Sequence, residues 1–283
     1  MEPYVKINYL LIYITSKCTL NCKLCVAGIP YHSPPRNLLK SSVIREMKNA
    51  FELYDEMDHA DIMGGEPLLH PDVIDFLHEL NKYHSKFKQM RIVTNCTIVP
   101  SDTVCEAIQD LVQKGSNVLF LLSNYGKLSK CINEVIYKLD TYHIPYRIDN
   151  YVGKNQRFDG WVDFGDFTDR GYTEAEAQQL YLDCRYGRRK GISDCHQMYE
   201  GKIYACPYYL LVSVFNKIDP LDNEYINLYD ETASIEQKKK ILLQMQSKPD
   251  YFAACKLCKG QTHYSKRYPA AEQIKKVQGD MHE

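Results

Sequence analysis

The sequence predicts an α/β protein whose first part is a parallel sheet covered by helices, in an open sheet or a complete or partial barrel. Strand-like and helix-like segments alternate through residues 8–149 with short connections, which is the order that parallel strands require. After about residue 165 the alternation stops, and five of the 11 cysteines follow. At roughly 100–200 residues per domain, 283 residues suit two units, which we expect at 1–170 and 171–283.

Apolar, β-branched runs predict the strands of the first part, and polar or glycine-rich stretches end them. The expected strands are 8–15, 59–63 before Gly64-Gly65, 91–94, 118–122 and 146–149, with a sixth at 161–164. Helices are expected between these strands. The first is capped by Ser41 or Ser42 and carries apolar side chains at helical spacing, and the second opens at Pro71-Asp72. Two more are expected at 101–114, closed by Gly115, and at about 129–142.

Local signals define the elements of the second part. Thr173 and Glu176 form a capping box for a helix that runs to about residue 183. Residues 196–205 have the pattern of a β-hairpin with its turn at Glu200-Gly201. Two further helices are expected at about 234–247 and 270–279.

Charge and composition exclude several classes of protein. Lys plus Arg total 35 against 36 for Asp plus Glu, so the net charge of −1 lacks the positive excess that nucleic-acid binding needs. No run of 18 apolar residues is present, so we expect no membrane-spanning helix. The amino terminus lacks a secretory signal, which predicts a cytoplasmic protein. In that reducing compartment, 11 cysteines indicate metal or redox chemistry rather than disulfides.

Three cysteines follow the first strand with the spacing CxxxCxxC, at Cys18, Cys22 and Cys25. Three thiolates are one short of the closed set that structural zinc needs, and they suit a [4Fe–4S] cluster with one iron open to another ligand. The alternative is a loop that holds three buried thiols. One crossover later, Met63-Gly64-Gly65-Glu66-Pro67 ends the second strand, where glycines permit close approach of a ligand. Glu66 adds a carboxylate suited to an ammonium group.

In these two motifs the sequence resembles the radical S-adenosylmethionine (SAM) enzymes, over about residues 9–149. The resemblance implies a partial (β/α)6 barrel on which the three motif cysteines hold a [4Fe–4S] cluster, with SAM chelating the fourth iron. It also implies that Gly64, Gly65 and Glu66 bind the SAM amino group, and that a flavodoxin- or ferredoxin-type protein supplies an electron. SAM is then cleaved to a 5′-deoxyadenosyl radical that abstracts a substrate hydrogen.

The ends of later strands supply further candidates. The family often has Thr-Asn-Gly where this chain has Thr94-Asn95-Cys96, so Asn95 is a predicted cofactor-binding residue and Cys96 departs from the pattern. Ser123 ends the fourth strand, where the resemblance implies a contact to the SAM ribose or carboxylate; a solvated turn is the alternative. Asp149-Asn150 ends the fifth strand and is a candidate for binding substrate hydroxyls.

The late cysteines predict a second metal site. Cys195 and Cys206 are symmetric about the hairpin turn, so they should face each other with Cα atoms within about 5.5 Å. Cys255 and Cys258 form a CxxC that presents both thiolates to one metal. On residues alone, these four thiolates suit either a structural zinc or an iron–sulfur cluster.

The stretch from Gly201 through Cys206 to the distant CxxC resembles the auxiliary-cluster extension of radical SAM enzymes, of the SPASM or shorter twitch type. The resemblance implies a second [4Fe–4S] cluster, held by Cys195, Cys206, Cys255 and Cys258 with Cys184 as the alternative to Cys195. The cysteine left over, Cys184 or Cys195, is either a hydrogen-atom donor to the substrate radical or a buried bystander. Donation would invert a carbon centre, whereas electron transfer to the auxiliary cluster would give oxidation.

We expect the substrate to be a carbohydrate-like small molecule, such as a sugar, aminocyclitol or nucleotide-sugar, that is epimerised or oxidised. The expected barrel begins within the first ten residues, without the leader-binding domain that many peptide-modifying relatives carry. Residues 151–169 are rich in aromatics, Gly, Asp and Asn, which suits stacking and hydrogen bonding to a hydroxylated ring. Two alternatives stay open: an epimerase or crosslinking enzyme for a ribosomal peptide, and a non-catalytic iron–sulfur or zinc scaffold protein.

Overall fold

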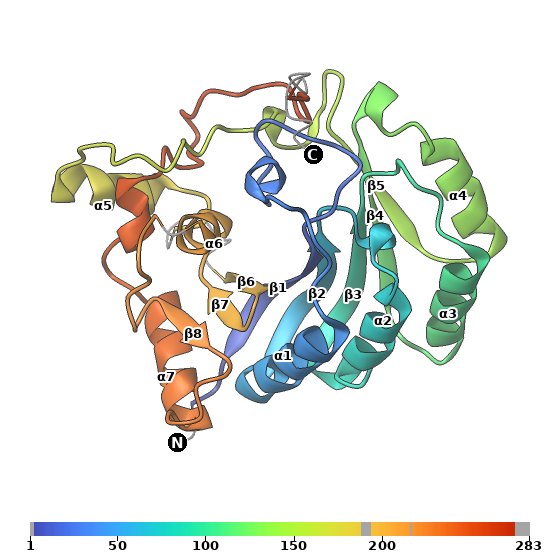
Figure 1. The fold of residues 1–283 in the computed structure, drawn as a ribbon, viewed down its shortest axis with the longest axis horizontal. Helices are drawn as coiled ribbons and strands as arrows, with labels where there is room; N and C mark the ends of the chain where they lie inside the picture. Colours follow the sequence, from blue (N-terminus) through green and yellow to red (C-terminus); the bar gives the residue numbers. More distant parts are fainter. Residues whose placement is uncertain (1–2, 188–193, 216, 275–283) are drawn as a thin grey trace, which may run out of the picture.

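The computed structural model describes residues 3–187, 194–215 and 217–274. Over these residues the chain forms one eight-stranded sheet in the order β5-β4-β3-β2-β1-β6-β7-β8 (Figure 1). The first five strands are β1 (Lys6–Thr15), β2 (Glu56–Gly64), β3 (Phe87–Thr94), β4 (Val118–Asn124) and β5 (Tyr146–Asn150). Each pairs in parallel with its neighbour, as the alternating sequence predicts.

The sixth parallel strand comes from the second part of the chain. β6 (Cys195–Tyr199) pairs in parallel with β1, and antiparallel β7 (Lys202–Tyr204) and β8 (Tyr225–Asn227) extend the sheet beyond it. The predicted partial barrel with a C-terminal hairpin and helices is therefore confirmed. The strand expected at 161–164 is wrong. In the described chain that segment pairs only through an isolated bridge between Trp161 and Tyr268, because it leaves the edge of the sheet after β5.

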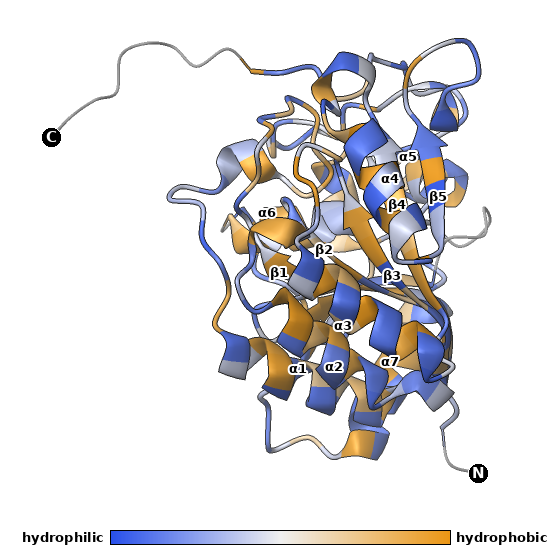
Figure 2. Cartoon of the chain, turned by 90° about the vertical axis from the view of Figure 1, so that its right-hand side faces the viewer, coloured by the Kyte–Doolittle hydropathy of each residue, from blue (hydrophilic) through white to orange (hydrophobic). Residues whose placement is uncertain are grey.

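Four helices of the described chain cover the outer face of β1 to β5: α1 (Lys40–Leu53), α2 (Val73–Asn81), α3 (Asp102–Gln113) and α4 (Ile132–Thr141). Each buries an apolar stripe, as α1 does with Val43, Met47 and Phe51. Figure 2 shows hydrophilic and hydrophobic residues side by side along α1, α2 and α3, as expected for helices with one buried side. Helix α3 begins where the sequence predicts, and it is capped by Ser101, whose side chain accepts from the Val104 N–H at 3.3 Å.

Helix α1 begins earlier than the sequence predicts. Its first turn follows Leu39, whose side chain makes no capping bond, so Ser41 and Ser42 lie inside the helix and the predicted cap is wrong. The start of α1 is held by Lys40, whose Nζ lies 2.7 Å from a carboxylate oxygen of Asp75 on α2.

The second part contains α5 (Glu174–Asp183), α6 (Pro207–Val214) and α7 (Ile235–Gln246). The capping box at Thr173 and Glu176 is present at the start of α5. The sequence does not predict helix α6. Nearly all of its residues are buried, so its apolar residues show no helical periodicity. The helix expected at 270–279 does not begin there: residues 270–274 are not helical, Ala271 has a φ of 55°, and the remainder lies outside the described residues.

The parallel strands β1 to β5 bring their carboxyl ends to one edge of the sheet, and the loops that follow these ends carry most of the candidate residues. None of the described helices is both long and apolar enough to span a bilayer.

Candidate active site

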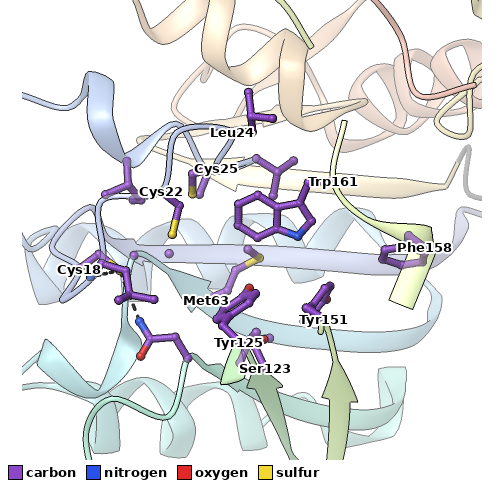
Figure 3. A pocket seen from close by; sticks show the side chains of 18 of the residues that line it. Cys18, Cys22, Leu24, Cys25, Met63, Ser123, Tyr125, Tyr151, Phe158 and Trp161 are labelled. Atoms are coloured by element: carbon purple, nitrogen blue, oxygen red, sulfur yellow. Dashed lines mark hydrogen bonds between the residues drawn. The ribbon is translucent and has the colours of Figure 1, made fainter. Parts of the chain in front are cut away.

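The three cysteines of the first motif line one pocket of about 250 Å³ (Figure 3). They follow β1 on a loop above the carboxyl ends of the strands, and all three are free thiols. Cys22 is buried, and Cys18 and Cys25 are partly buried. The spacing CxxxCxxC thus does bring three thiols to one concave site.

Polar hydrogens point at the sulfur atoms. Cys18 Sγ accepts from the Leu20 N–H at 3.4 Å and from Asn95 Nδ2 at 3.5 Å, and Cys22 Sγ accepts from Gln273 Nε2 at 3.1 Å. Burial raises the pKa of Cys18 to about 11 and that of Cys22 to about 12. Without a cation these thiols keep their protons, and a bound metal cluster would release them. Donors arranged around thiolate sulfurs are typical of iron–sulfur sites.

Gly64 and Gly65 are required where the end of β2 meets the end of β1. A Cβ atom on Gly64 would lie 2.3 Å from the Thr15 carbonyl oxygen, and one on Gly65 would lie 2.1 Å from the Lys17 carbonyl oxygen. The Gly65 N–H donates to the Thr15 carbonyl at 2.8 Å. Both glycines also line the pocket. They therefore allow the cysteine loop to pack directly on the second strand.

The carboxylate of Glu66 has a different setting from the one expected. It is completely buried, does not line the pocket, and accepts from the Asn95 N–H at 2.8 Å and the Leu68 N–H at 3.2 Å. Burial raises its pKa to about 7. In this structure Glu66 ties the end of β2 to the end of β3, and its predicted contact with the SAM amino group stays a prediction.

Asn95 and Ser123, the other two predicted cofactor-binding residues, both line the pocket. Asn95 follows β3, and its Nδ2 contacts both the Cys18 sulfur and Thr19 Oγ1. Cys96, where the family has glycine, adopts a φ of 58°, the left-handed conformation that glycine favours. Cys96 therefore adopts the same backbone turn that a glycine would make at this position.

An aromatic wall faces the cysteine loop (Figure 3). Tyr125 and Tyr151 stack with ring centroids 5.1 Å apart, and Trp161 meets Tyr125 edge-on at 5.7 Å. Phe158 extends this wall. The predicted aromatic segment 151–169 thus contributes to the pocket, whereas Tyr125, just after β4, has no local sequence signal that marks it.

Asp149 and Asn150 do not line the pocket. The Asp149 carboxylate accepts from Arg157 at 2.7 Å and from Arg147 at 3.1 Å. Asn150 accepts from the side chain of Asn124 at 2.8 Å. Their predicted role in binding substrate hydroxyls has no support in this geometry.

A second, smaller cavity of about 30 Å³ is lined by four cysteines: Cys184, Cys206, Cys255 and Cys258. It is too small for an organic substrate, since such pockets measure roughly 300–1,000 Å³. Backbone N–H groups again donate to sulfur, from Tyr209 to Cys206 at 3.3 Å and from Gly260 to Cys258 at 3.2 Å. Three separate segments of the chain therefore bring four thiols to one small cavity.

Cys195 does not line this cavity. It is on β6, where it pairs with Tyr9 of β1, and its sulfur accepts from Gln197 Nε2 at 3.4 Å. The ladder between β6 and β7 ends at Gln197 and Tyr204, because Cys206 already caps α6. Cys195 and Cys206, the expected facing pair, lie beyond the paired part of this ladder, and Cys184, the alternative residue, lines the cavity.

The spacing of the thiols bears on the zinc alternative. In the described chain no three or more His, Cys, Asp or Glu side chains converge closely enough to hold a single metal ion. Zinc would need four thiolate sulfurs at about 2.3 Å from one point. A cluster of four irons separates its thiolates more widely than a single zinc ion does.

Two aromatic side chains line both cavities. Tyr186 and Phe164 belong to the lining of the larger pocket and to that of the four-cysteine cavity. The Tyr186 hydroxyl is also within electrostatic range of Cys184, Cys195 and Cys206. No spacing motif marks Tyr186, which is two residues after Cys184.

The C-terminal strap, residues 268–274, runs beside two residues that line the pocket, Trp161 and Cys22. It pairs with Trp161 through Tyr268 and with Cys22 through Gln273. The Gln273 side chain also accepts from the Asn21 N–H at 2.7 Å, in addition to donating to Cys22 sulfur. The sequence predicts a helix here, and no pattern in it indicates that Gln273 contacts Cys22.

Comparisons with known proteins agree with this geometry. Residues 12–120 match the family model described as the radical SAM superfamily. The chain is 35% identical over 92 residues to a GTP 3′,8-cyclase of Campylobacter jejuni and 33% identical over 90 residues to molybdenum cofactor biosynthesis protein 1 of Homo sapiens. These matches cover 32% and 31% of the chain, but only 28% and 14% of the two relatives.

Two solved structures share the fold over nearly the whole chain. Polyhistidine-tagged anSMEcpe with bound AdoMet gives a TM-score of 0.54 at 13% identity, covering 95% of this chain and 93% of that one. BtrN in complex with AdoMet and 2-DOIA gives a TM-score of 0.53 at 12% identity, covering 94% and 99%. At these identities the likeness concerns the fold.

Proposed function

Because the chain is a radical SAM protein, with that domain over residues 12–120, we propose that it is an enzyme that abstracts a hydrogen atom from a small-molecule substrate. The observation that carries the proposal is the single pocket lined by Cys18, Cys22 and Cys25 together with the Gly64–Gly65 turn. Three thiols from one loop and a close-packed glycine turn beside them suit a cluster with one open iron and a bound SAM.

The residues present fit both groups. Cys18, Cys22 and Cys25 would hold the [4Fe–4S] cluster, which with SAM supplies a 5′-deoxyadenosyl radical when reduced by a flavodoxin- or ferredoxin-type donor. Asn95 orients Cys18 through its amide, and Gln273 does the same for Cys22. The aromatic wall keeps water away from the reacting atoms. Ser123, buried at the end of β4, offers a hydroxyl for a SAM contact.

We assign the four-cysteine cavity to a second [4Fe–4S] cluster, in a C-terminal unit at about 171–283. Cys184, Cys206, Cys255 and Cys258 are its proposed ligands, in place of the set that includes Cys195. Support comes from the four cysteines that line one small cavity and from the N–H groups that donate to two of their sulfurs.

We propose a carbohydrate-like substrate that is epimerised or oxidised. The wall of Tyr125, Tyr151, Phe158 and Trp161 supports this, because aromatic faces bind the apolar faces of sugar-like rings and also nucleobases. A purine nucleotide is the second candidate, favoured by the partial match to a GTP 3′,8-cyclase. A peptide substrate and a non-catalytic scaffold are further outcomes that the experiment below separates.

The test is anaerobic production of 5′-deoxyadenosine from SAM under dithionite, with and without sugars, nucleotide-sugars, GTP and short peptides. We expect cleavage by the wild type, none by the Cys18→Ala, Cys22→Ala, Cys25→Ala triple variant, and stimulation by one substrate class. Cys105→Ala is the matched control, because Cys105 is buried in α3 away from the pocket. A reconstituted wild type that binds iron and cleaves no SAM would reject the enzyme and favour the scaffold.

A further inference from the structure

Epimerisation requires a group that returns a hydrogen atom to the substrate radical. A spare cysteine, Cys184 or Cys195, is one candidate for this donor from the sequence, but Cys18, Cys22 and Cys25 are the only cysteines among the described residues that line the larger pocket. Cys184 lines the second cavity, and Cys195 lines neither. A donor inside the pocket must therefore be sought among other side chains with a weak X–H bond.

Phenol hydroxyls meet this requirement, because a tyrosine O–H bond is weaker than an aliphatic C–H bond, whereas the O–H bonds of Ser and Thr are not. Three tyrosines line the pocket: Tyr125, Tyr151 and Tyr186. Tyr125 and Tyr151 stack on each other in the aromatic wall. Tyr186 differs from both because it also lines the four-cysteine cavity, beside Cys184 and Cys206.

That double position gives Tyr186 two neighbours that a hydrogen-atom donor needs. On one side lies the space where the radical forms, and on the other lies a site suited to one-electron chemistry. Phe164 lines the same two cavities and packs with its ring centroid 6.4 Å from that of Tyr186, but it has no hydroxyl. Tyr186 is thus the only hydroxyl-bearing residue common to the two linings among the residues that the structure describes.

We infer that Tyr186 is the hydrogen-atom donor of this active site, an inference that rests on the proposed radical function. In this step the Tyr186 O–H bond breaks, a C–H bond forms on the carbon radical, and a neutral tyrosyl radical remains. One electron and one proton then restore the phenol. The electron comes from a one-electron reductant, dithionite in the test below and an iron–sulfur protein in the cell, and the proton comes from solvent.

The test needs no substrate, because SAM itself is the probe. Reconstituted protein is supplied with SAM and dithionite in heavy water, where the Tyr186 hydroxyl carries deuterium. We expect a substantial fraction of the 5′-deoxyadenosine to carry one solvent deuterium, and Tyr186→Phe to lower that fraction at least fivefold. The same comparison is made with Tyr125→Phe, Tyr151→Phe and Cys195→Ala.

A second measurement avoids dependence on any variant. Wild-type protein made with ring-deuterated tyrosine and frozen during turnover should show a tyrosyl EPR signal that is narrower than that of unlabelled protein. Loss of deuterium transfer in Tyr125→Phe or Cys195→Ala, with transfer kept in Tyr186→Phe, overturns the inference, as does unlabelled 5′-deoxyadenosine from the wild type. Absence of any 5′-deoxyadenosine would instead mean that the proposed function itself fails.

Discussion

Replacing Glu66 by Gln tests how the end of β2 is held to the end of β3. The change keeps the size of the side chain but removes its charge and one of its two acceptor oxygens. In the buried site these oxygens accept from the Asn95 N–H at 2.8 Å and the Leu68 N–H at 3.2 Å. Gln satisfies one of these donors and turns its own NH2 toward the other. A buried donor without an acceptor costs about 1–3 kcal/mol of unfolding free energy.

The difference in unfolding free energy between the wild type and Glu66→Gln depends on pH. Burial raises the pKa of Glu66 from 4.5 to about 7, so protonation favours the folded state. This contribution is complete below pH 4.5 and is lost as the pH rises through 7, with a total of about 3 kcal/mol. Gln does not titrate. We therefore expect Glu66→Gln to be less stable than the wild type at pH 6, and the difference to shrink or reverse at pH 8.5.

The assay is urea denaturation of the metal-free, reduced protein at both pH values, followed by SAM binding to the reconstituted protein. Glu52→Gln is the control, because Glu52 is exposed on α1. Unchanged unfolding free energies at both pH values, together with weaker SAM binding, would refute the reasoning. The carboxylate would then act on the ligand and not on Asn95 and Leu68.

Three further predictions concern the iron content of the protein, the reduction potential of the first cluster and the pH dependence of the unfolding free energy. Cys184→Ala should lower the iron content from about eight to about four atoms per chain while Cys195→Ala leaves about eight; the reverse pattern, or stoichiometric zinc, contradicts the ligand assignment. Gln273→Leu removes the donor to Cys22 and should make the potential of the first cluster more negative in an EPR-monitored titration, whereas Gln109→Leu on α3 should not. Burial lowers the pKa of His196 to about 4, so the stability it contributes is present above pH 6.5 and lost as the pH falls through 4, by about 3 kcal/mol in total. His196→Phe should flatten that part of the curve of unfolding free energy against pH, and an unchanged curve would contradict the burial of a neutral imidazole.

Local patterns were enough to predict the parallel half of the fold. The alternation of apolar strands and amphipathic helices located β1 to β5 and α1 to α4, because each element carries its own periodicity. The starts of β2 and β3 were placed too late, at 59 and 91 in place of Glu56 and Phe87. Polar residues such as Asp58 and Gln89 occupy those starts, and a strand that is polar on one side gives a weak sequence signal.

Features that depend on distant pairing could not be predicted. Cys18, Cys22 and Cys25 share one loop, so their spacing alone brings them together. The choice between Cys184 and Cys195 depends on β6 pairing with β1, far away in the chain. Gln273 reaches Cys22 across 251 residues, and no local pattern encodes that contact.

The most direct test of the central claim, that the pocket of Cys18, Cys22 and Cys25 binds SAM at an iron–sulfur cluster, is the EPR spectrum of the reduced protein with and without SAM. We expect SAM to change the signal of one cluster in the wild type and in Cys184→Ala, because the open iron lies in the first site. In the triple variant of Cys18, Cys22 and Cys25 that signal and its response should both be absent. A SAM-dependent signal that survives in the triple variant, or a wild-type spectrum that SAM leaves unchanged, would contradict the account.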